Sequence, residues 1–185
     1  MDIEKVGVIG AGQMGNGIAH VLALAGYQVT ITDLNQAALD NARVVIDRNL
    51  ARQVKGAKIT ADQKVDAIAR ISTTLALSDL GAADLVIEAA TEKEALKHSL
   101  FEALVPHLQP HTILTSNTSS ISITRLASRT DRPEKFMGFH FMNPVPVMGL
   151  VGLMRGIATD KATYDSCLAV VNRLGKTAAS AEDFP

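Results

Sequence analysis

The chain has 185 residues, with 18 Lys and Arg against 19 Asp and Glu, a net charge of −1, and 47% hydrophobic residues. The balanced charge argues against a nucleic-acid-binding protein, and a single cysteine, Cys167, excludes an internal disulfide and a cysteine-based metal cluster. No apolar run approaches the roughly 18 residues of a membrane-spanning helix. We expect no targeting signal at the N-terminus, and these features indicate one domain in a reducing cytoplasm or a mature organellar form, without a nucleic-acid or membrane partner.

Strand-like and helix-like segments alternate along the chain. Short apolar or β-branched runs predict strands, and amphipathic or Ala/Leu-rich runs predict helices. In chain order we expect strands at 5–9, 28–33, 84–88, 112–115 and 135–140, and helices at 16–25, 37–54, 60–70, 93–107, shortly after Ser120, and at 160–174. This alternation is typical of an α/β protein with a doubly wound, mostly parallel sheet, a Rossmann-like fold.

Two of the expected helices form an excursion from the sheet. Asn35 is expected to cap the first, and Thr60-Ala-Asp-Gln63 has the pattern of a capping box that opens the second. A basic tip around residues 55–58 joins them. We assign residues 1–180 to the Rossmann-like domain and interpret 181–185 as the start of a connection to a further domain.

Gly10, Gly12 and Gly15 have the G-x-G-x-x-G spacing of a dinucleotide-binding turn. The first glycine permits the tight turn, the second lets a pyrophosphate approach the backbone, and the third allows close packing of helix on strand. Asp33 ends the next expected strand, near the spacing (roughly 20 residues) of a carboxylate that holds the ribose hydroxyls. Because its charge repels a 2′-phosphate, NAD is favoured over NADP. The alternative is an ordinary turn with a solvated aspartate.

Four segments carry a more specific pattern. They are Gly10-Ala-Gly-Gln-Met-Gly15, Val86-Ile-Glu-Ala-Ala-Thr-Glu92, Ser116-Asn-Thr-Ser-Ser120 and His140-Phe-Met-Asn-Pro-Val-Pro-Val-Met148. Together they closely resemble the NAD-binding domain of the L-3-hydroxyacyl-CoA dehydrogenase family, which includes the 3-hydroxybutyryl-CoA dehydrogenases. The resemblance implies an oxidoreductase of fatty-acid or butanoate metabolism that passes hydride between an acyl-CoA 3-hydroxyl and NAD. It also implies a homodimer for the full-length members.

The resemblance implies roles for individual residues. His140 matches the general base, Ser119 a serine that hydrogen-bonds the reacting oxygen, and Asn143 an asparagine that fixes substrate and histidine. Imidazole suits proton transfer near neutral pH, and the two donors suit an oxyanion site. The expected cofactor contacts are Gly10, Gly12, Gln13, Met14, Gly15, Asp33, Glu92, Lys97 and Asn117. The expected substrate contacts are Ser119, Asn143 and Lys55, the last on an arm that contacts CoA in the family.

Ordinary roles stay open for several of these residues. Glu92 and Lys97 are poorly spaced for an intrahelical pair, so the alternative is two exposed helix charges. Lys55 is equally interpreted as a solvated helix end, and His140 as a core or capping histidine. Cys167 lies on an apolar helix face and is expected to be inert core. The histidines are scattered without ligand spacing, so no metal site is expected.

The sequence departs from the family beside the expected general base. The glutamate that pairs with the family's histidine is matched by Gly152, and a lysine often found at the position of residue 149 is matched by Gly149. No other acid lies between His140 and Asp160. Loss of the orienting carboxylate in a Ser-His-Asp arrangement costs about 10⁴ in rate, so we expect little or no activity. The family's C-terminal helical domain, which supplies the dimer interface and part of the acyl pocket, is also expected to be missing.

Two other functions therefore stay open. A non-catalytic NAD or acyl-CoA binding module, or a degenerate fragment, is consistent with intact glycines and a lost carboxylate. A dehydrogenase of related fold that acts on free hydroxy acids shares the glycine signature. The segments Ser116–Ser120 and His140–Met148 argue against that second function.

Overall fold

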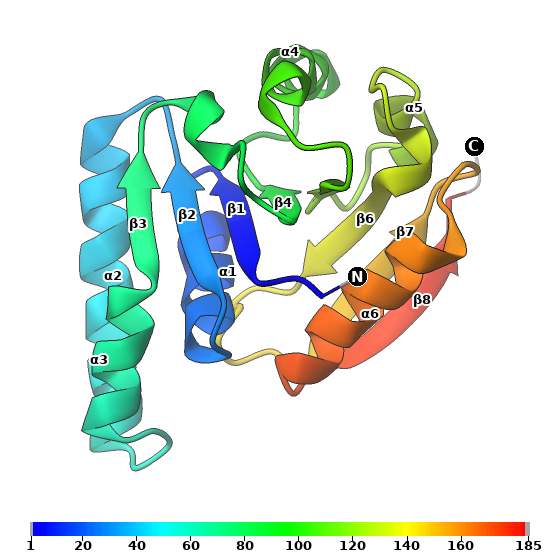
Figure 1. Ribbon diagram of the computed structural model, residues 1–185. Helices are drawn as coiled ribbons and strands as arrows, with labels where there is room; N and C mark the ends of the chain where they lie inside the picture. The colour runs from blue at the N-terminus through cyan, green and yellow to red at the C-terminus, as the bar shows by residue number, and fades with distance from the viewer. Residues whose placement is uncertain (1, 184–185) are drawn as a thin grey trace.

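The computed structural model describes residues 2–183, and an eight-stranded sheet runs through it in the order β3-β2-β1-β4-β5-β6-β7-β8 (Figure 1). The strands are β1 Lys5–Ile9, β2 Gln28–Thr32, β3 Ile71–Thr74, β4 Leu85–Glu88, β5 Ile113–Ser116, β6 Phe136–Phe141, β7 Leu150–Arg155 and β8 Thr177–Glu182. Neighbouring strands are parallel except β6 and β7, which are antiparallel. The expected doubly wound, mostly parallel sheet is confirmed.

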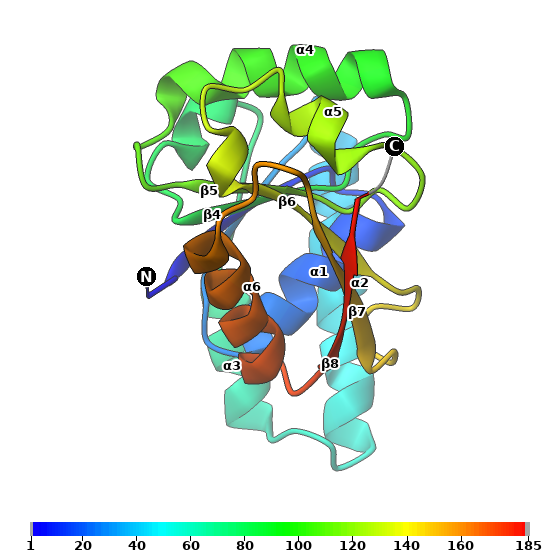
Figure 2. The same ribbon diagram turned by 90° about the vertical axis from the view of Figure 1, so that its right-hand side faces the viewer.

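Helices cover both faces of this sheet. They are α1 Gln13–Leu24, α2 Gln36–Lys55, α3 Ala61–Ala69, α4 Glu94–Leu104, α5 Ile123–Ala127 and α6 Lys161–Arg173, with 3-10 segments at Leu77–Leu80, Val105–His107 and Pro133–Lys135. Figure 2 shows α4 and α5 on one side of the sheet and α1 and α6 on the other. None of the helices within residues 2–183 combines the length and apolar character needed to span a bilayer.

The core is divided by the sheet into two layers, because successive side chains of a strand point to opposite faces. Leu85 and Ile87 of β4 pack with the residues of α1, α2 and α6, whereas Val86 packs with those of α4 and α5. Cys167 of α6 is fully buried in the first layer, and burial raises the pKa of its thiol to about 12. Its expected place in the core is confirmed.

The excursion between β2 and β3 is a helical hairpin that projects beyond the sheet (Figure 1). The Asn35 side chain accepts a hydrogen bond from Ala37 N, and Thr60 and Gln63 form a reciprocal capping box. Both expected caps are confirmed. The hairpin tip follows Lys55, the exposed last residue of α2.

The structure adds three strands that the sequence pattern does not predict: β3, β7 and β8. It also starts α1 at Gln13, ahead of the expected residue 16, because Gly12 already occupies the N-cap position. β8 continues through Ala181 and Glu182, so the expected connection from residue 181 begins inside a strand. The last residues of that connection, 184 and 185, lie outside the described residues.

Candidate active site

The strand order reverses beside β1, which pairs with β2 on one side and with β4 on the other. Open α/β sheets bind ligands at such a switch point, outside the carboxyl ends of the strands. A cavity of about 550 Å³ opens there, with Gly10 and Asp33 in its lining. A second cavity of about 200 Å³ shares Ala90 and Thr91 with the first. The lining of the second contains four expected cofactor residues: Met14, Glu92, Lys97 and Asn117.

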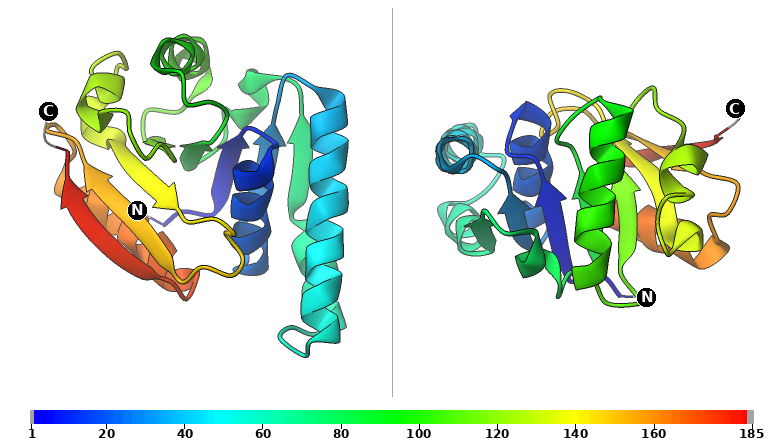
Figure 3. Two further views of the ribbon diagram at one scale, coloured as in Figure 1. Left: turned by 180° about the vertical axis from the view of Figure 1, so that it is seen from behind. Right: turned by 90° about the horizontal axis from the view of Figure 1, so that it is seen from above.

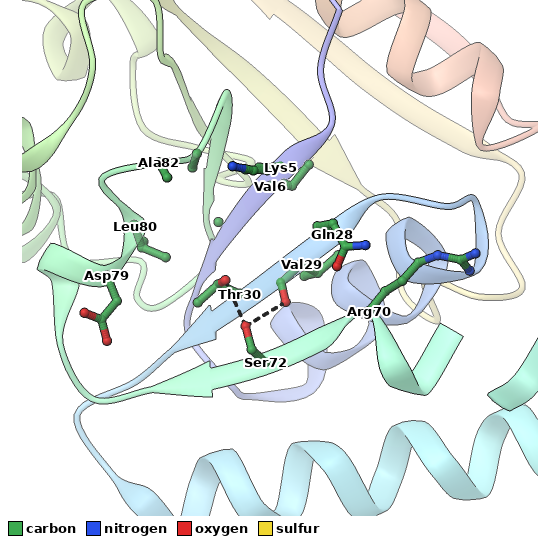
Figure 4. A pocket seen from close by; sticks show the side chains of 12 residues that line it. Lys5, Val6, Gln28, Val29, Thr30, Arg70, Ser72, Asp79, Leu80 and Ala82 are labelled. Atoms are coloured by element: carbon green, nitrogen blue, oxygen red, sulfur yellow. Dashed lines mark hydrogen bonds between the residues drawn. The ribbon is translucent and has the colours of Figure 1, made fainter. Parts of the chain in front are cut away.

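Another hollow, of about 270 Å³, lies at the opposite end of the same strands (Figure 4). Its lining includes Lys5 and Gln28, the first residues of β1 and β2, and a hydrogen bond of 3.0 Å joins the Thr30 and Ser72 hydroxyls on its wall. Its lining contains none of the expected site residues. The switch point is therefore the better candidate for the active site.

At two of the three positions in the glycine turn, the backbone leaves no room for a side chain. Gly10 has φ +102°, and a Cβ there would lie 2.6 Å from the Ala89 carbonyl oxygen. A Cβ on Gly15 would lie 1.7 Å from the Gly10 carbonyl oxygen. A Cβ on Gly12 would meet nothing within 4 Å among residues 2–183. The fold thus requires Gly10 and Gly15, while Gly12 leaves open space at the N-terminus of α1, where unpaired N–H groups favour an anion.

Asp33 ties the end of β2 to this turn. Its Oδ2 accepts a hydrogen bond from Ala11 N at 2.8 Å, and its Oδ1 accepts one from Asn35 N at 3.1 Å. The carboxylate lines the larger cavity and is held in place by backbone N–H groups of two segments. It is therefore not a freely solvated strand end.

A buried ion pair forms one wall of the smaller cavity. The fully buried Glu88 carboxylate accepts hydrogen bonds from Lys97 Nζ, from Ser116 Oγ at 2.8 Å and from Ala90 N at 2.8 Å. Lys97 is only 1% exposed, so the interpretation of Lys97 as an exposed helix charge is wrong. A buried charge needs such partners to offset its lost hydration. The sequence analysis missed Glu88, although an acid that closes an apolar strand was the signal available.

Glu92 is exposed and does not pair with Lys97. Its Oε2 accepts a hydrogen bond from Thr118 Oγ1 at 2.7 Å, which holds the carboxylate against the loop after β5. Glu92 and Lys97 therefore line one cavity from separate anchors. Since Glu88 already balances the charge of Lys97, the exposed charge at this cavity is the Glu92 carboxylate.

His140, near the end of β6, is held by the backbone of Asn117. Its Nδ1 lies 2.8 Å from the Asn117 carbonyl oxygen. Because a carbonyl only accepts, Nδ1 carries the proton, and Nε2 of the neutral ring is an acceptor. The Asn117 side chain also accepts a hydrogen bond from Phe141 N at 2.8 Å. Asn117 thus fixes the end of β6 through both its backbone and its side chain.

Asn143 follows β6 and contacts the glycine turn. Gln13 Nε2 donates to Asn143 Oδ1 at 3.2 Å, which leaves the Asn143 Nδ2 donor group for another acceptor. Ser119 is exposed on the loop after β5, and within residues 2–183 its hydroxyl has no hydrogen-bond partner. Lys55 lies exposed at the hairpin tip, and within residues 2–183 no hydrogen bond or ion pair joins its side chain to the other expected residues. Gly149 is exposed, and Gly152 lies on β7 opposite β6.

A family model described as 3-hydroxyacyl-CoA dehydrogenase, NAD binding domain, matches residues 5–184. The chain belongs to this family. The resemblance of its four motifs is thereby confirmed, and NAD is the cofactor of this dehydrogenase domain. The open space at Gly12, beside the first turn of α1, fits a dinucleotide pyrophosphate.

Several dehydrogenases are similar to the chain over nearly all of its length. It is 55% identical over 183 residues (99% of the chain) to a 3-hydroxybutyryl-CoA dehydrogenase of Bradyrhizobium diazoefficiens, of which it covers 62%. It is 44% identical over its full length to a probable 3-hydroxybutyryl-CoA dehydrogenase of Bacillus subtilis, of which it covers 64%. The crystal structure of an (S)-3-hydroxybutyryl-CoA dehydrogenase from Ralstonia eutropha superposes with a TM-score of 0.97 at 42% identity, covering 100% of this chain and 65% of that one. The chain thus spans less than two thirds of each relative.

Proposed function

We propose that the protein is an NAD-dependent 3-hydroxyacyl-CoA dehydrogenase of the 3-hydroxybutyryl-CoA type. The main support is the hydrogen bond from His140 Nδ1 to the Asn117 carbonyl, because it leaves Nε2 of the neutral ring as a base. His140 lies on β6, just before the segment that holds Asn143. Gln13, at the glycine turn, donates a hydrogen bond to the Asn143 side chain. A general base and the dinucleotide-binding turn thus belong to one connected site.

When bound, NAD would supply the acceptor for the hydride that leaves C3 of the substrate. His140 Nε2 takes the proton of the 3-hydroxyl, so the C–H and O–H bonds break as the carbonyl forms. The imidazolium produced keeps its Nδ1 hydrogen bond to the Asn117 carbonyl, a bond that strengthens when its donor is charged. In the reverse direction, Asn143 Nδ2 and the Ser119 hydroxyl donate to the carbonyl oxygen and stabilise its developing negative charge.

The remaining expected residues bind the two ligands. Asp33, at the larger cavity, would accept hydrogen bonds from the ribose hydroxyls, and Glu92 and Lys97, at the smaller one, would contact the cofactor. Lys55 supplies a point charge for the phosphates of CoA from the hairpin tip. A homodimer is the proposed assembly of the full-length protein.

A non-catalytic NAD or acyl-CoA binding module is the second candidate. It is favoured by Gly152, the direct β7 partner of His140, because this residue offers no carboxylate to the ring. We therefore expect turnover well below that of an enzyme with an ionised partner for the histidine.

The test is to mix the purified protein with NADH and acetoacetyl-CoA and to follow the loss of nicotinamide absorbance. The dehydrogenase assignment predicts slow NADH oxidation above the no-enzyme control, which His140→Gln is expected to reduce about 10²–10⁴-fold without changing the NADH dissociation constant. His107→Gln, at an exposed position, is the matched control. A flat trace with normal NADH binding would refute the dehydrogenase and favour the binding module.

A further inference from the structure

The segment between β6 and β7 is held by a lysine from a distant part of the chain. Lys176 Nζ donates to the Val145 carbonyl oxygen at 2.8 Å and to the Met148 carbonyl oxygen at 2.5 Å. Burial lowers the pKa of Lys176, whose side chain lies between the two carbonyls. One ammonium therefore joins both ends of the turn that follows Asn143.

The position of Lys176 is set by the end of α6. Gly175 has φ +67°, its N–H bonds the Asn172 carbonyl at 3.0 Å, and Lys176 N bonds the Val171 carbonyl at 3.2 Å. These two bonds define a Schellman motif, which fixes the direction of the chain after a helix. The next residue, Thr177, donates from its N–H to the Gly149 carbonyl at 2.7 Å. These three backbone hydrogen bonds thus fix the position from which Lys176 reaches the β6–β7 segment.

Helix α1 holds the same segment from the other side. Val145 is 2% exposed, and a Cβ on Gly17 would lie only 2.9 Å from the Val145 Cβ. Figure 3 shows the segment between β6 and β7 beside α1. At its start, Asn143 accepts the hydrogen bond from Gln13. The segment is therefore packed against α1 and fastened by Lys176, with Asn143 at the edge nearest the glycine turn.

We propose that Lys176 is a positioning residue for the dehydrogenase reaction, which fixes Asn143 at the reacting oxygen by holding the Val145 and Met148 carbonyls. The proposal rests on the proposed function, in which Asn143 donates to that oxygen. Without the ammonium, both carbonyls lose this donor, and the segment is held less tightly against α1. A displacement of about 1 Å at a positioning group costs around 100-fold in rate.

The first test observes the Asn143 side-chain amide by NMR in the full protein, with the resonance assigned from its loss in Asn143→Ala. Lys176→Met keeps the apolar stem but removes the donor, and it is expected to shift or broaden this resonance. Lys176→Arg retains a donor and is expected to preserve it. Lys161→Met, at a side chain 83% exposed on α6, is the matched control. An unchanged resonance in a folded Lys176→Met protein would overturn the proposal, and Lys176→Gln replaces that variant if it does not fold.

The second test measures turnover with NADH and acetoacetyl-CoA. Lys176→Met is expected to lower kcat about tenfold or more while the NADH dissociation constant stays unchanged. In the Asn143→Ala background the same substitution is expected to have less than about a twofold effect, because residues that act through one another are not additive. Fully additive losses would overturn the proposal. An inactive wild-type protein would count against the proposed function alone, because the NMR test of Lys176 needs no turnover.

Discussion

His140 and Gly152 are direct cross-strand partners in the antiparallel pair β6–β7, and a Cβ on residue 152 would lie 3.5 Å from the His140 Cβ. That distance is an ordinary van der Waals contact, so a Cβ is accommodated at position 152. Opposed residues of neighbouring strands share one face of a sheet. A longer acidic side chain at position 152 would therefore lie on the same face as the imidazole. Within residues 2–183, the hydrogen-bond partner of that ring is the neutral Asn117 carbonyl.

Gly152→Glu is expected to raise turnover at least about tenfold in the full-length protein. The added carboxylate stabilises the imidazolium formed at His140 more than a neutral carbonyl does. The measurement is kcat/KM for NADH oxidation with acetoacetyl-CoA. Gly149→Glu adds the same charge at an exposed position. Among the described residues its Cβ would meet nothing within 4 Å beyond its chain neighbours, and the change is expected to leave the rate unchanged. Equal rates for wild type and Gly152→Glu would show that no carboxylate is needed.

Gly15→Ala is expected to lower the stability of the protein, whereas Gly12→Ala is expected to weaken its binding of NADH. The Gly15 Cβ would overlap the Gly10 carbonyl oxygen at 1.7 Å, so Gly15→Ala is expected to lower the free energy of unfolding by about 1–3 kcal/mol. Gly12→Ala is expected to leave unfolding nearly unchanged but to weaken NADH binding, because its methyl group fills space needed by the pyrophosphate. Urea unfolding and NADH fluorescence titration separate the two effects. A stable Gly12→Ala protein with normal NADH affinity would contradict this assignment of the turn.

The stability of the protein is expected to fall as the pH drops below about 6.5, partly through His20. This residue is 1% exposed, and its Nε2 bonds Gln53 Oε1 at 3.0 Å. Burial lowers the pKa of His20, and the charge of Lys176 lowers it further. The unfolded chain therefore takes up a proton near pH 6.5 that the folded protein binds only at lower pH, and acid favours unfolding by up to about 1.4 kcal/mol per pH unit.

Urea unfolding of His20→Gln between pH 7.5 and 5.5 measures this contribution. The variant is expected to lose less stability across that range than the wild type, whatever its stability at pH 7.5. His107→Gln removes an exposed histidine and is expected to keep the wild-type slope. Parallel slopes for His20→Gln and the wild type would exclude His20 as a cause.

The sequence predicts the elements whose own residues carry the signal. The strand β4 reads Leu-Val-Ile-Glu, and all four of its positions are buried. The caps at Asn35 and Thr60 depend on local residue types. The edge strand β8 has no such pattern, because it reads Thr-Ala-Ala-Ser-Ala-Glu and is mostly exposed. Its conformation comes from pairing with β7, in which Gly152 interrupts the apolar run. Tertiary pairing decides such strands more than their own propensity.

The candidate site is predictable to the same extent. Side chains with a motif around them, such as Asp33 and His140, are found from the sequence. The partner of His140 is a backbone carbonyl, and every residue has one, so no pattern of residue types reveals that contact. The Glu88–Lys97 pair joins the end of a strand to a helix, and the two side chains meet only after α4 packs on the sheet.

The place of β1 between β2 and β4 also determines when, during synthesis on the ribosome, the dinucleotide-binding turn can become part of a paired sheet. β1 needs both β2 and β4, and Lys5 N meets the Asp84 carboxylate across 79 positions of the chain. At about 5–20 residues per second, a ribosome takes roughly 4–16 seconds to make that stretch. During this interval the nascent chain carries the glycine turn with at least one edge of its strand unpaired. Such an edge pairs readily with other chains, so the interval is a period of exposure to aggregation during synthesis.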